Sequence, residues 1–242
     1  MTLLLLAGTG EARRIADRLA GQVPAIATLA GVTRNARLLA IPTHSGGFGG
    51  EAGFCAFLQD RGIRAVLDAT HPFAAQISQR SARLCQTLGV PYCQLLRPEW
   101  QPEDGDRWVD LADEAEAADH VPDGAVVFIA TGRQTVEKYG NLAARRMICR
   151  VVDPPGCAFP YPGGTYFVAR PPFTVAEEEA CFSRLGVTWL IAKNAGGEAG
   201  RSKLIAARRL GICVGMVRRP AQPHAPKVET VAAAIAWALS AT

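Results

Sequence analysis

Short apolar runs alternate with amphipathic segments along almost the whole chain. The apolar runs have the length of strands, whereas the longest segment between them repeats Phe73, Ile77, Leu84 and Leu88 at roughly helical spacing. The pattern predicts strands at residues 3–7, 25–30, 38–41, 65–68, 92–96, 126–130, 147–152, 166–169, 188–192 and 213–217. It predicts helices at residues 11–20, 50–61, 72–88, 111–119, 175–185, 201–210 and 231–239.

This alternation of continuously apolar strands with helices indicates an α/β fold, in which parallel sheets are covered by helices on both faces. A Pro-containing, acidic stretch interrupts the alternation near the middle of the chain. The sequence therefore predicts two similar α/β lobes, at residues 1–100 and 123–242, joined by a crossover at residues 101–122.

The composition excludes several classes of protein. The 242 residues are 49% hydrophobic and carry a net charge of +4 without a basic block or stripe, so we expect no nucleic-acid partner. No apolar run approaches the roughly 20 residues of a membrane span, and no signal peptide is expected. The seven cysteines form no C-x-x-C and the four histidines no H-E-x-x-H, which favours a cytoplasmic protein without disulfides or a metal site.

The first strand runs directly into the stretch GTGEA at residues 8–12. Two glycines allow a tight turn, and its backbone N–H groups can bind phosphate together with the N-terminus of the following helix. The third glycine of the dinucleotide-binding fingerprint is replaced by Arg13. The stretch is therefore either a nucleotide site with altered packing or a plain turn between strand and helix.

The segment after the second strand contains Thr33, Arg34 and Arg37, and lacks the acidic residue that holds the ribose 2′-hydroxyl of NAD. A guanidinium favours a 2′-phosphate, so the pattern favours NADPH over NADH, unless both arginines are solvated loop residues. After the third strand, the stretch HSGGFGGEAG at residues 44–53 places four glycines around Phe48. Such a loop suits either close approach to a flat ligand or simple flexibility.

The stretch DATHPFA at residues 68–74 follows the fourth strand. Thr70 is placed to cap a helix that Pro72 opens. His71 then lies at the carboxyl end of a strand, where open α/β sheets bind ligands, and it can donate a proton near neutral pH. The alternative is that His71 only caps or packs.

In the second half of the chain, Arg133, Arg170 and Lys193 each lie just beyond a strand, and Asn194 follows the last of them. Residues 201–203 bring further polar side chains to the start of a helix. Because the carboxyl ends of parallel strands share one edge, we expect these cations to lie together and to bind a polycarboxylate. Taken singly, each is more simply explained as a solvated surface charge.

Four motifs in the same order resemble the precorrin-6A reductase family of cobalamin biosynthesis, which includes the cobalt-precorrin-6A reductases. They are GTGEAR at the first turn, DATHPFA after the fourth strand, ATGR in the second lobe, and AKNAGG followed by SKLIAAR and RP. The first motif of the family also lacks the third glycine, so the resemblance favours a nucleotide site there. One departure is Ala195, where relatives often carry serine.

The resemblance implies two Rossmann-like lobes with the active site in the cleft between them. It also implies NADPH as cofactor and hydride transfer that converts precorrin-6A to precorrin-6B without a covalent intermediate. The implied cofactor residues are Gly8, Thr9, Gly10, Glu11, Ala12, Gly31, Thr33, Arg34, Gly46, Gly47, Phe48, Thr70, Pro72 and Phe73. The implied residues for the anionic tetrapyrrole are Arg133, Arg170, Lys193, Asn194, Arg201, Ser202 and Lys203. His71 is the best side-chain candidate for the proton donor, with water or a substrate carboxyl as alternatives.

Other interpretations stay open at this point. The cobalt-containing substrate fits the same motifs, and the residues barely separate it from the metal-free one. An NADPH-sensing domain would need only the first lobe and would leave the basic residues of the second unexplained. A tetrapyrrole methyltransferase would also be α/β, but its motifs are not found. We expect a monomer or a weak homo-oligomer.

Overall fold

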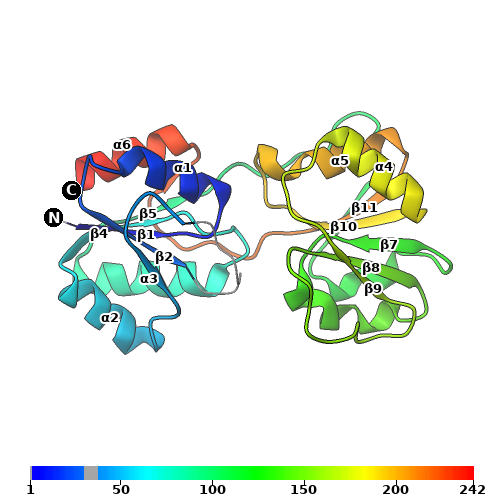
Figure 1. Cartoon of the computed structure of the whole chain (residues 1–242), viewed down its shortest axis with the longest axis horizontal. Coiled ribbons are helices and arrows are strands. Elements are labelled where there is room, and N and C mark those ends of the chain that lie inside the picture. The colour runs from blue at the N-terminus through cyan, green and yellow to red at the C-terminus, as the bar shows by residue number, and fades with distance from the viewer. Residues whose placement is uncertain (1, 30–37) are drawn as a thin grey trace. The chain divides into compact units, whose positions relative to one another are not determined.

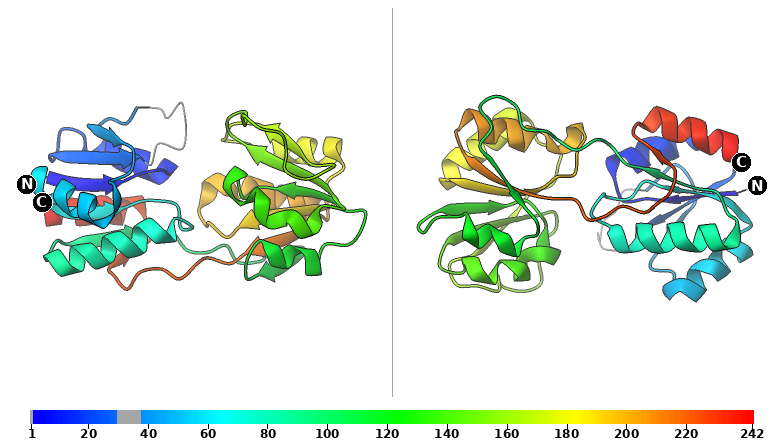
Figure 2. Two further views of the ribbon diagram at one scale, coloured as in Figure 1. Left: turned by 90° about the horizontal axis from the view of Figure 1, so that it is seen from below. Right: turned by 180° about the vertical axis from the view of Figure 1, so that it is seen from behind.

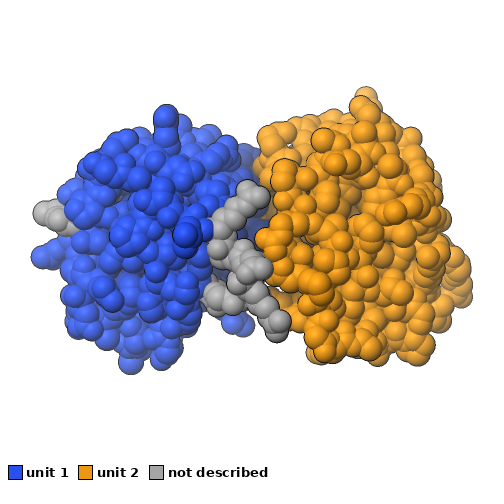
Figure 3. All heavy atoms as spheres, viewed as in Figure 1, with its two compact units in different colours: residues 1–98, 220–242 blue, residues 99–219 orange. Residues whose placement is uncertain are grey.

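The computed structural model describes residues 2–29 and 38–242, which form two compact units. The first unit comprises the chain up to Pro98 together with Pro220–Thr242, and the second comprises Glu99–Arg219 (Figure 3). Each unit contains one six-stranded sheet whose neighbouring strands are parallel. Helices flank both sheets, which confirms the predicted α/β fold (Figure 1).

The first sheet has the strand order β12-β5-β4-β1-β2-β3. Its strands are β1 (Thr2–Leu6), β2 (Ala25–Leu29), β3 (Thr43–Ser45), β4 (Ile63–Asp68), β5 (Tyr92–Leu95) and β12 (Lys227–Val228). Its helices are α1 (Gly10–Leu19), α2 (Gly50–Asp60), α3 (Ala75–Leu88) and α6 (Val231–Ala241). Leu3 and Leu5 pack in one core with α1 and α6, whereas Leu4 and Leu6 pack in another with α2 and α3. The central strand is therefore buried on both faces.

The second sheet has the order β6-β11-β10-β7-β8-β9. Its strands are β6 (Trp108–Leu111), β7 (Val126–Ile129), β8 (Arg146–Val151), β9 (Thr165–Val168), β10 (Trp189–Lys193) and β11 (Cys213–Val217). The helices are α4 (Val175–Leu185) and α5 (Ser202–Arg209), with the 3₁₀ segments η1 (Ala115–Asp119), η2 (Arg133–Leu142) and η3 (Glu198–Gly200). Phe182 of α4 and Leu204 of α5 pack with Phe128, Leu190 and Met216 of the sheet.

The two sheets repeat one topology and exchange their sixth strands. After β5 the chain passes into the second unit, where β6 takes the edge position next to β11. After β11 it returns to the first unit, where β12 takes the edge position next to β5. Figure 2 shows both connecting segments. Residues 101–122 therefore open the second unit rather than forming a crossover outside it, and residues 220–242 belong to the first unit, unlike the division predicted from sequence.

The sequence predicts the third strand at residues 38–41, and this prediction is wrong, because the strand lies at Thr43–Ser45. Ile41 is buried in the core beside α1, whereas Leu38 is 91% exposed, so the apolar run does not form a strand. The true β3 is a short polar strand at the edge of the sheet. Hydrophobic periodicity does not mark such a strand.

The prediction of a helix over residues 111–119 is also wrong for the first half of that range. Leu111 ends β6, and helical structure begins at Ala115 as a 3₁₀ segment. Asp113 Oδ1 accepts hydrogen bonds from the N–H groups of Ala115 at 2.8 Å and Glu116 at 3.3 Å. This aspartate therefore starts a short local turn instead of lying inside a longer helix.

The third helix begins at Ala75 rather than at Pro72. Thr70 does not cap it, because the Thr70 hydroxyl donates to Asp68 Oδ1 at 2.7 Å. Residues 69–74 form a separate turn between β4 and α3.

Candidate active site

The first sheet has a topological switch point between β1 and β4. From β1 the chain proceeds to β2 and β3 on one side, and it then crosses to β4 and β5 on the other. In open parallel sheets, the loops at the carboxyl ends of two such strands diverge and leave a crevice where ligands bind. The turn at residues 8–10 follows β1, and the turn at residues 69–74 follows β4. Both sequence-predicted motifs therefore lie at this switch point.

Thr9 joins the two turns. Its hydroxyl donates to the carbonyl oxygen of Ala69 at 2.8 Å and accepts from the N–H of Ala12 at 3.1 Å, which caps α1. Gly8 has φ of +137°, a conformation that side chains rarely adopt. Apart from the adjoining residues and the nearby backbone of α1 itself, no described atom lies within 4 Å of where a Cβ would stand on Gly8 or Gly10. The turn thus leaves space beside the N-terminus of α1, which is the arrangement that binds phosphate.

Arg13 stands at the position of the third glycine of the fingerprint. Its guanidinium donates to the carbonyl oxygen of Leu38 at 2.7 Å, so its charged end lies away from the contact between helix and sheet. That contact is made by Ala12, Ile15 and Ala16, which are fully buried in the core with β1. The small side chains of Ala12 and Ala16 allow close packing of the helix on the sheet, for which the usual fingerprint employs glycine.

The sequence interpretation missed Arg97 at the same edge of the sheet. This arginine lies just beyond β5 and pairs with Glu11 in the first turn of α1, at 3.3 Å. The two side chains are only 15% and 14% exposed. Burial lowers the pKa of Arg97, and the carboxylate of Glu11 opposes that shift. The sequence signal that could have marked Arg97 as a candidate site residue is its place directly after a predicted strand, followed by Pro98.

The turn after β4 carries the other predicted residues. Asp68, the last residue of β4, is fully buried and accepts hydrogen bonds from Thr70. His71 is exposed, and its Nδ1 accepts from the N–H of Phe73 at 3.2 Å. The ring of Phe73 lies 5.8 Å from that of His71. His71 therefore helps to shape the turn and also presents an imidazole at the switch point.

The glycine-rich loop at residues 46–50 lies farther along the same edge, beyond β3, which is two strands from β1. Phe48 packs against Phe54 and Phe57 of α2, with ring centroids 4.9 and 5.2 Å apart. Its side chain is thus part of the core as well as of the loop. Gly31, Thr33 and Arg34, the predicted residues after β2, lie outside the described residues.

The second sheet repeats the switch point between β7 and β10. Lys193 ends β10, and its Nζ donates to the carbonyl oxygen of Thr131, beyond β7, at 3.1 Å. The same Nζ lies 3.8 Å from Glu114, a buried carboxylate that also accepts from Lys138 at 2.9 Å. Burial lowers the pKa of Lys193. The carboxylate of Glu114 raises this pKa, and the positive charge of Lys138 lowers it, so the net shift is downward. Arg133 is exposed and begins η2 directly after β7.

The other predicted substrate residues have partners within the second unit. The Asn194 side chain accepts from the N–H of Trp100 at 2.9 Å and donates to its carbonyl oxygen at 3.1 Å, so it anchors that segment. Lys203 donates to Gly200 and lies over the indole ring of Trp100, whereas Arg170 pairs with Asp153 at 2.6 Å. Ser202 is half-buried at the first position of α5.

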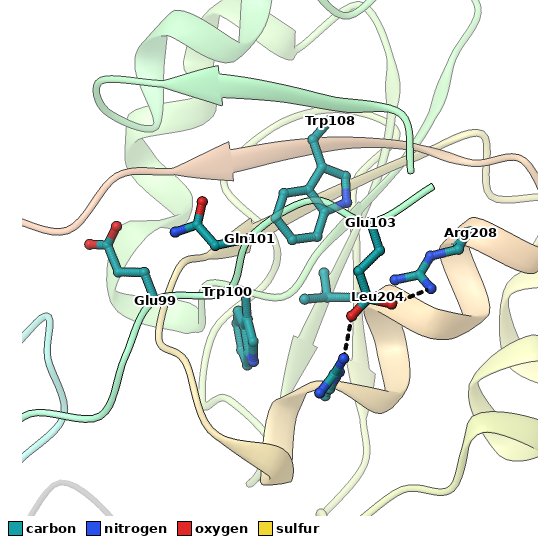
Figure 4. Close-up of a pocket in the computed structure, with 8 residues that line it drawn as sticks. Glu99, Trp100, Gln101, Glu103, Trp108, Leu204 and Arg208 are labelled. Carbon is teal, nitrogen blue, oxygen red and sulfur yellow. Dashed lines mark hydrogen bonds and ion pairs between the residues drawn. The ribbon is translucent and has the colours of Figure 1, made fainter. Parts of the chain in front are cut away.

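Arg201 lines a cavity of about 200 Å³ between the segment Glu99–Trp108 and α5 (Figure 4). Glu103 pairs there with Arg201 and accepts from Arg208 Nη1 at 2.8 Å. These arginines lower the pKa of the Glu103 carboxyl. The structure thus brings Arg133 and Lys193 to one switch point and holds Arg201 on the flank of the unit.

Among the residues that the structure describes, no three histidine, cysteine, aspartate or glutamate side chains gather in a way that could hold a metal ion. No described helix is long and apolar enough to cross a membrane.

Comparison with known proteins identifies the family. The model of the family "Precorrin-6x reductase CbiJ/CobK" matches residues 2–239. The chain belongs to this reductase family. The match confirms the resemblance to this family that the sequence analysis drew from four motifs.

Members of the precorrin-6x reductase family match over nearly the whole chain. A precorrin-6A reductase of Rhodococcus erythropolis is 44% identical over 97% of this chain and 96% of its own length. A cobalt-precorrin-6A reductase of Methanothermobacter thermautotrophicus is 28% identical over 91% of this chain and 77% of its own length. The solved structure of a CobK precorrin-6A reductase superposes with a TM-score of 0.94 at 37% identity, covering 100% of this chain and 97% of that one.

Proposed function

We propose that this protein reduces precorrin-6A with NADPH, binding the cofactor on its first unit and the tetrapyrrole on its second. The observation that carries the proposal is the pair of hydrogen-bonded turns at residues 8–10 and 69–74, at the switch point of the first sheet. There the family's two N-terminal motifs meet through the hydrogen bond from Thr9 to Ala69. Family membership supplies the class of reaction.

The residues at the first switch point fit a dinucleotide. The N-terminus of α1, with Gly8, Thr9 and Gly10, would hold the pyrophosphate, because its N–H groups and the space beside the glycines suit an anion. Thr70, Pro72 and Phe73 would bound the nicotinamide. When bound, NADPH supplies the hydride. The protein holds the reactants in place, and His71 is the side-chain candidate for delivering the proton that completes the reduction.

The basic residues of the second unit support an anionic tetrapyrrole as the substrate. Lys193 and Arg133 would bind carboxylates at the second switch point, with Arg170, Arg201 and Lys203 as further candidates. Asn194 would act indirectly, by fixing the segment at Trp100. We propose no covalent intermediate.

The metal-free substrate is favoured over the cobalt-containing one. Curated precorrin-6A reductases are 38–44% identical to this chain, whereas the cobalt-precorrin-6A reductases are 26–28% identical. This gap supports placement in the aerobic pathway. Turnover measured with both substrates tests the choice directly.

Cofactor choice tests the role of Arg34. We expect wild-type protein to prefer NADPH over NADH by about tenfold or more in kcat/KM, because a guanidinium pairs with the 2′-phosphate. Arg34→Ala should reduce this preference by raising KM for NADPH while leaving KM for NADH nearly unchanged. Steady-state kinetics with both cofactors measures the effect, and Arg64→Ala, which alters an exposed residue of β4, serves as the control. An unchanged preference in Arg34→Ala would remove this residue from the cofactor site.

The lowered pKa of Lys193 predicts a pH dependence of substrate binding. A lysine binds carboxylates only below its pKa, so a lowered pKa means that this charge is lost at a lower pH than for an ordinary lysine. We expect KM for the tetrapyrrole to rise on the alkaline side, and the rise to move to higher pH in Lys193→Arg. Profiles of KM against pH measure this. A rise at the same pH in both proteins would show that another group is responsible.

A further inference from the structure

Asp68 is an unusual carboxylate in the first unit because it is completely buried. It accepts hydrogen bonds from the phenol of Tyr92 at 2.6 Å, from the N–H of Thr70 at 2.9 Å and from the Thr70 hydroxyl at 2.7 Å. Tyr92 approaches one carboxylate oxygen, and Thr70 approaches the other. Asp68 therefore links the first residue of β5 to the turn that follows β4.

This link fixes the turn at its base. Thr70 donates twice to the same oxygen of Asp68, which determines the direction in which the chain leaves β4. The carbonyl oxygen of Ala69 is held by Thr9 from the turn after β1. The carbonyl oxygen of Pro72 accepts from Gln222 at 3.0 Å. Three separate contacts thus converge on one short turn, and the contact through Asp68 leads on to the buried hydrogen bond from Tyr92.

The phenol of Tyr92 can donate its hydrogen bond to Asp68 at any pH at which the protein works. Tyr92 is 6% exposed, and burial together with the neighbouring carboxylate of Asp68 raises its pKa far above the ordinary value. The phenol therefore keeps its proton over the whole working pH range and continues to donate. A phenylalanine would fill the same space but would leave one oxygen of Asp68 without this donor.

We propose that Tyr92, acting through Asp68, is a positioning residue that sets the turn at residues 69–73 against the reacting end of the cofactor. This inference rests on the proposed function, which places the nicotinamide beside that turn. Tyr92 contacts neither cofactor nor substrate in this scheme. Its effect reaches the reaction through the orientation of Thr70 and the residues that follow it.

The test is Tyr92→Phe, which removes one hydroxyl group. Because small misplacements of reacting groups slow chemistry strongly, we expect kcat to fall about 10- to 100-fold. KM for NADPH should change by less than about twofold, since the phosphate turn at residues 8–10 is intact. The isotope effect with NADPH deuterated at the transferred position should increase, because hydride transfer becomes slower relative to the other steps.

Matched variants separate positioning from general destabilisation. Tyr161→Phe removes a tyrosine hydroxyl that donates to Glu137 in the second unit, and it should leave kcat and the isotope effect unchanged. Thr70→Val removes the hydroxyl that donates to Asp68 and should speed amide hydrogen exchange of residues 69–73 as Tyr92→Phe does, a readout that does not depend on contact between Thr70 and the cofactor. All assays are run well below the midpoint of thermal unfolding of each variant.

Two results would overturn the inference. One is an unchanged kcat and isotope effect in folded Tyr92→Phe, and the other is a loss confined to KM for NADPH. Amide hydrogen exchange of residues 69–73 provides a readout that does not need turnover, and we expect faster exchange in Tyr92→Phe. If wild-type protein fails to reduce the substrate, the proposed function fails. Unchanged exchange in Tyr92→Phe would then separately reject the role of Tyr92 in holding the turn.

Discussion

Gly8→Val is expected to weaken NADPH binding by about 10- to 100-fold. Gly8 has φ of +137°, and a β-branched residue in such a conformation costs about 1–3 kcal/mol. The turn would relax to avoid this cost, and the N–H groups at the start of α1 would lose their common orientation toward the phosphates. At about 1.4 kcal/mol for each factor of ten, the strain corresponds to the expected loss of affinity. Titration of cofactor fluorescence measures it without substrate.

Gly62→Val is the matched control for Gly8→Val. Gly62 also has a positive φ, +58°. It directly precedes β4, so it lies at the amino ends of the parallel strands, whereas Gly8 lies at their carboxyl ends. Replacement of Gly62 should lower stability by a similar mechanism while leaving NADPH affinity within about twofold. Equal losses of affinity in the two variants would contradict a phosphate site at Gly8.

Arg150→Met is expected to lower the free energy of unfolding by about 3–5 kcal/mol, because it leaves a buried carboxylate without its partner. Arg150 of β8 pairs with Glu178 of α4 at 2.7 Å, and the two side chains are 13% and 2% exposed. The guanidinium also lies over the rings of Phe128 and Phe173, at 5.2 and 4.5 Å from their centroids. Urea unfolding followed by circular dichroism measures the loss.

Two further variants isolate the buried charge as the cause. Arg209→Met breaks the exposed pair with Glu179 and should cost no more than about 1 kcal/mol. Adding Glu178→Leu to Arg150→Met removes the orphaned carboxylate and should recover most of the lost stability. A double variant as unstable as Arg150→Met alone would attribute the loss to packing over the two rings.

The central strands could be predicted from the sequence, because strands buried on both faces read as continuous apolar runs. Leu3–Leu6 are almost completely buried and were identifiable on that ground. The edge strands β3, β6 and β12 were not, since they are short, polar or half-exposed and are defined by a neighbour distant in the chain. The exchange of β6 and β12 between the sheets has no local signature at all.

The candidate site divides in the same way. The turns at residues 8–10 and 69–74 carry local signals, because glycine and proline have fixed conformational effects. Arg97 and Tyr92 lie against Glu11 and Asp68, partners that only the folded sheet brings within reach. Asn194 is the opposite case. The sequence assigns its side chain to the substrate, but in the structure that side chain forms two hydrogen bonds with the backbone of Trp100.

The most direct test of the proposed function is oxidation of NADPH in the presence and absence of metal-free precorrin-6A, with the mass of the product determined. We expect oxidation only when the tetrapyrrole is present, one NADPH consumed per tetrapyrrole, and a product heavier by two hydrogen atoms. The cobalt-containing substrate should react much more slowly. Tight NADPH binding without oxidation in the presence of either substrate would contradict the proposal and leave a cofactor-binding protein with no reductase activity.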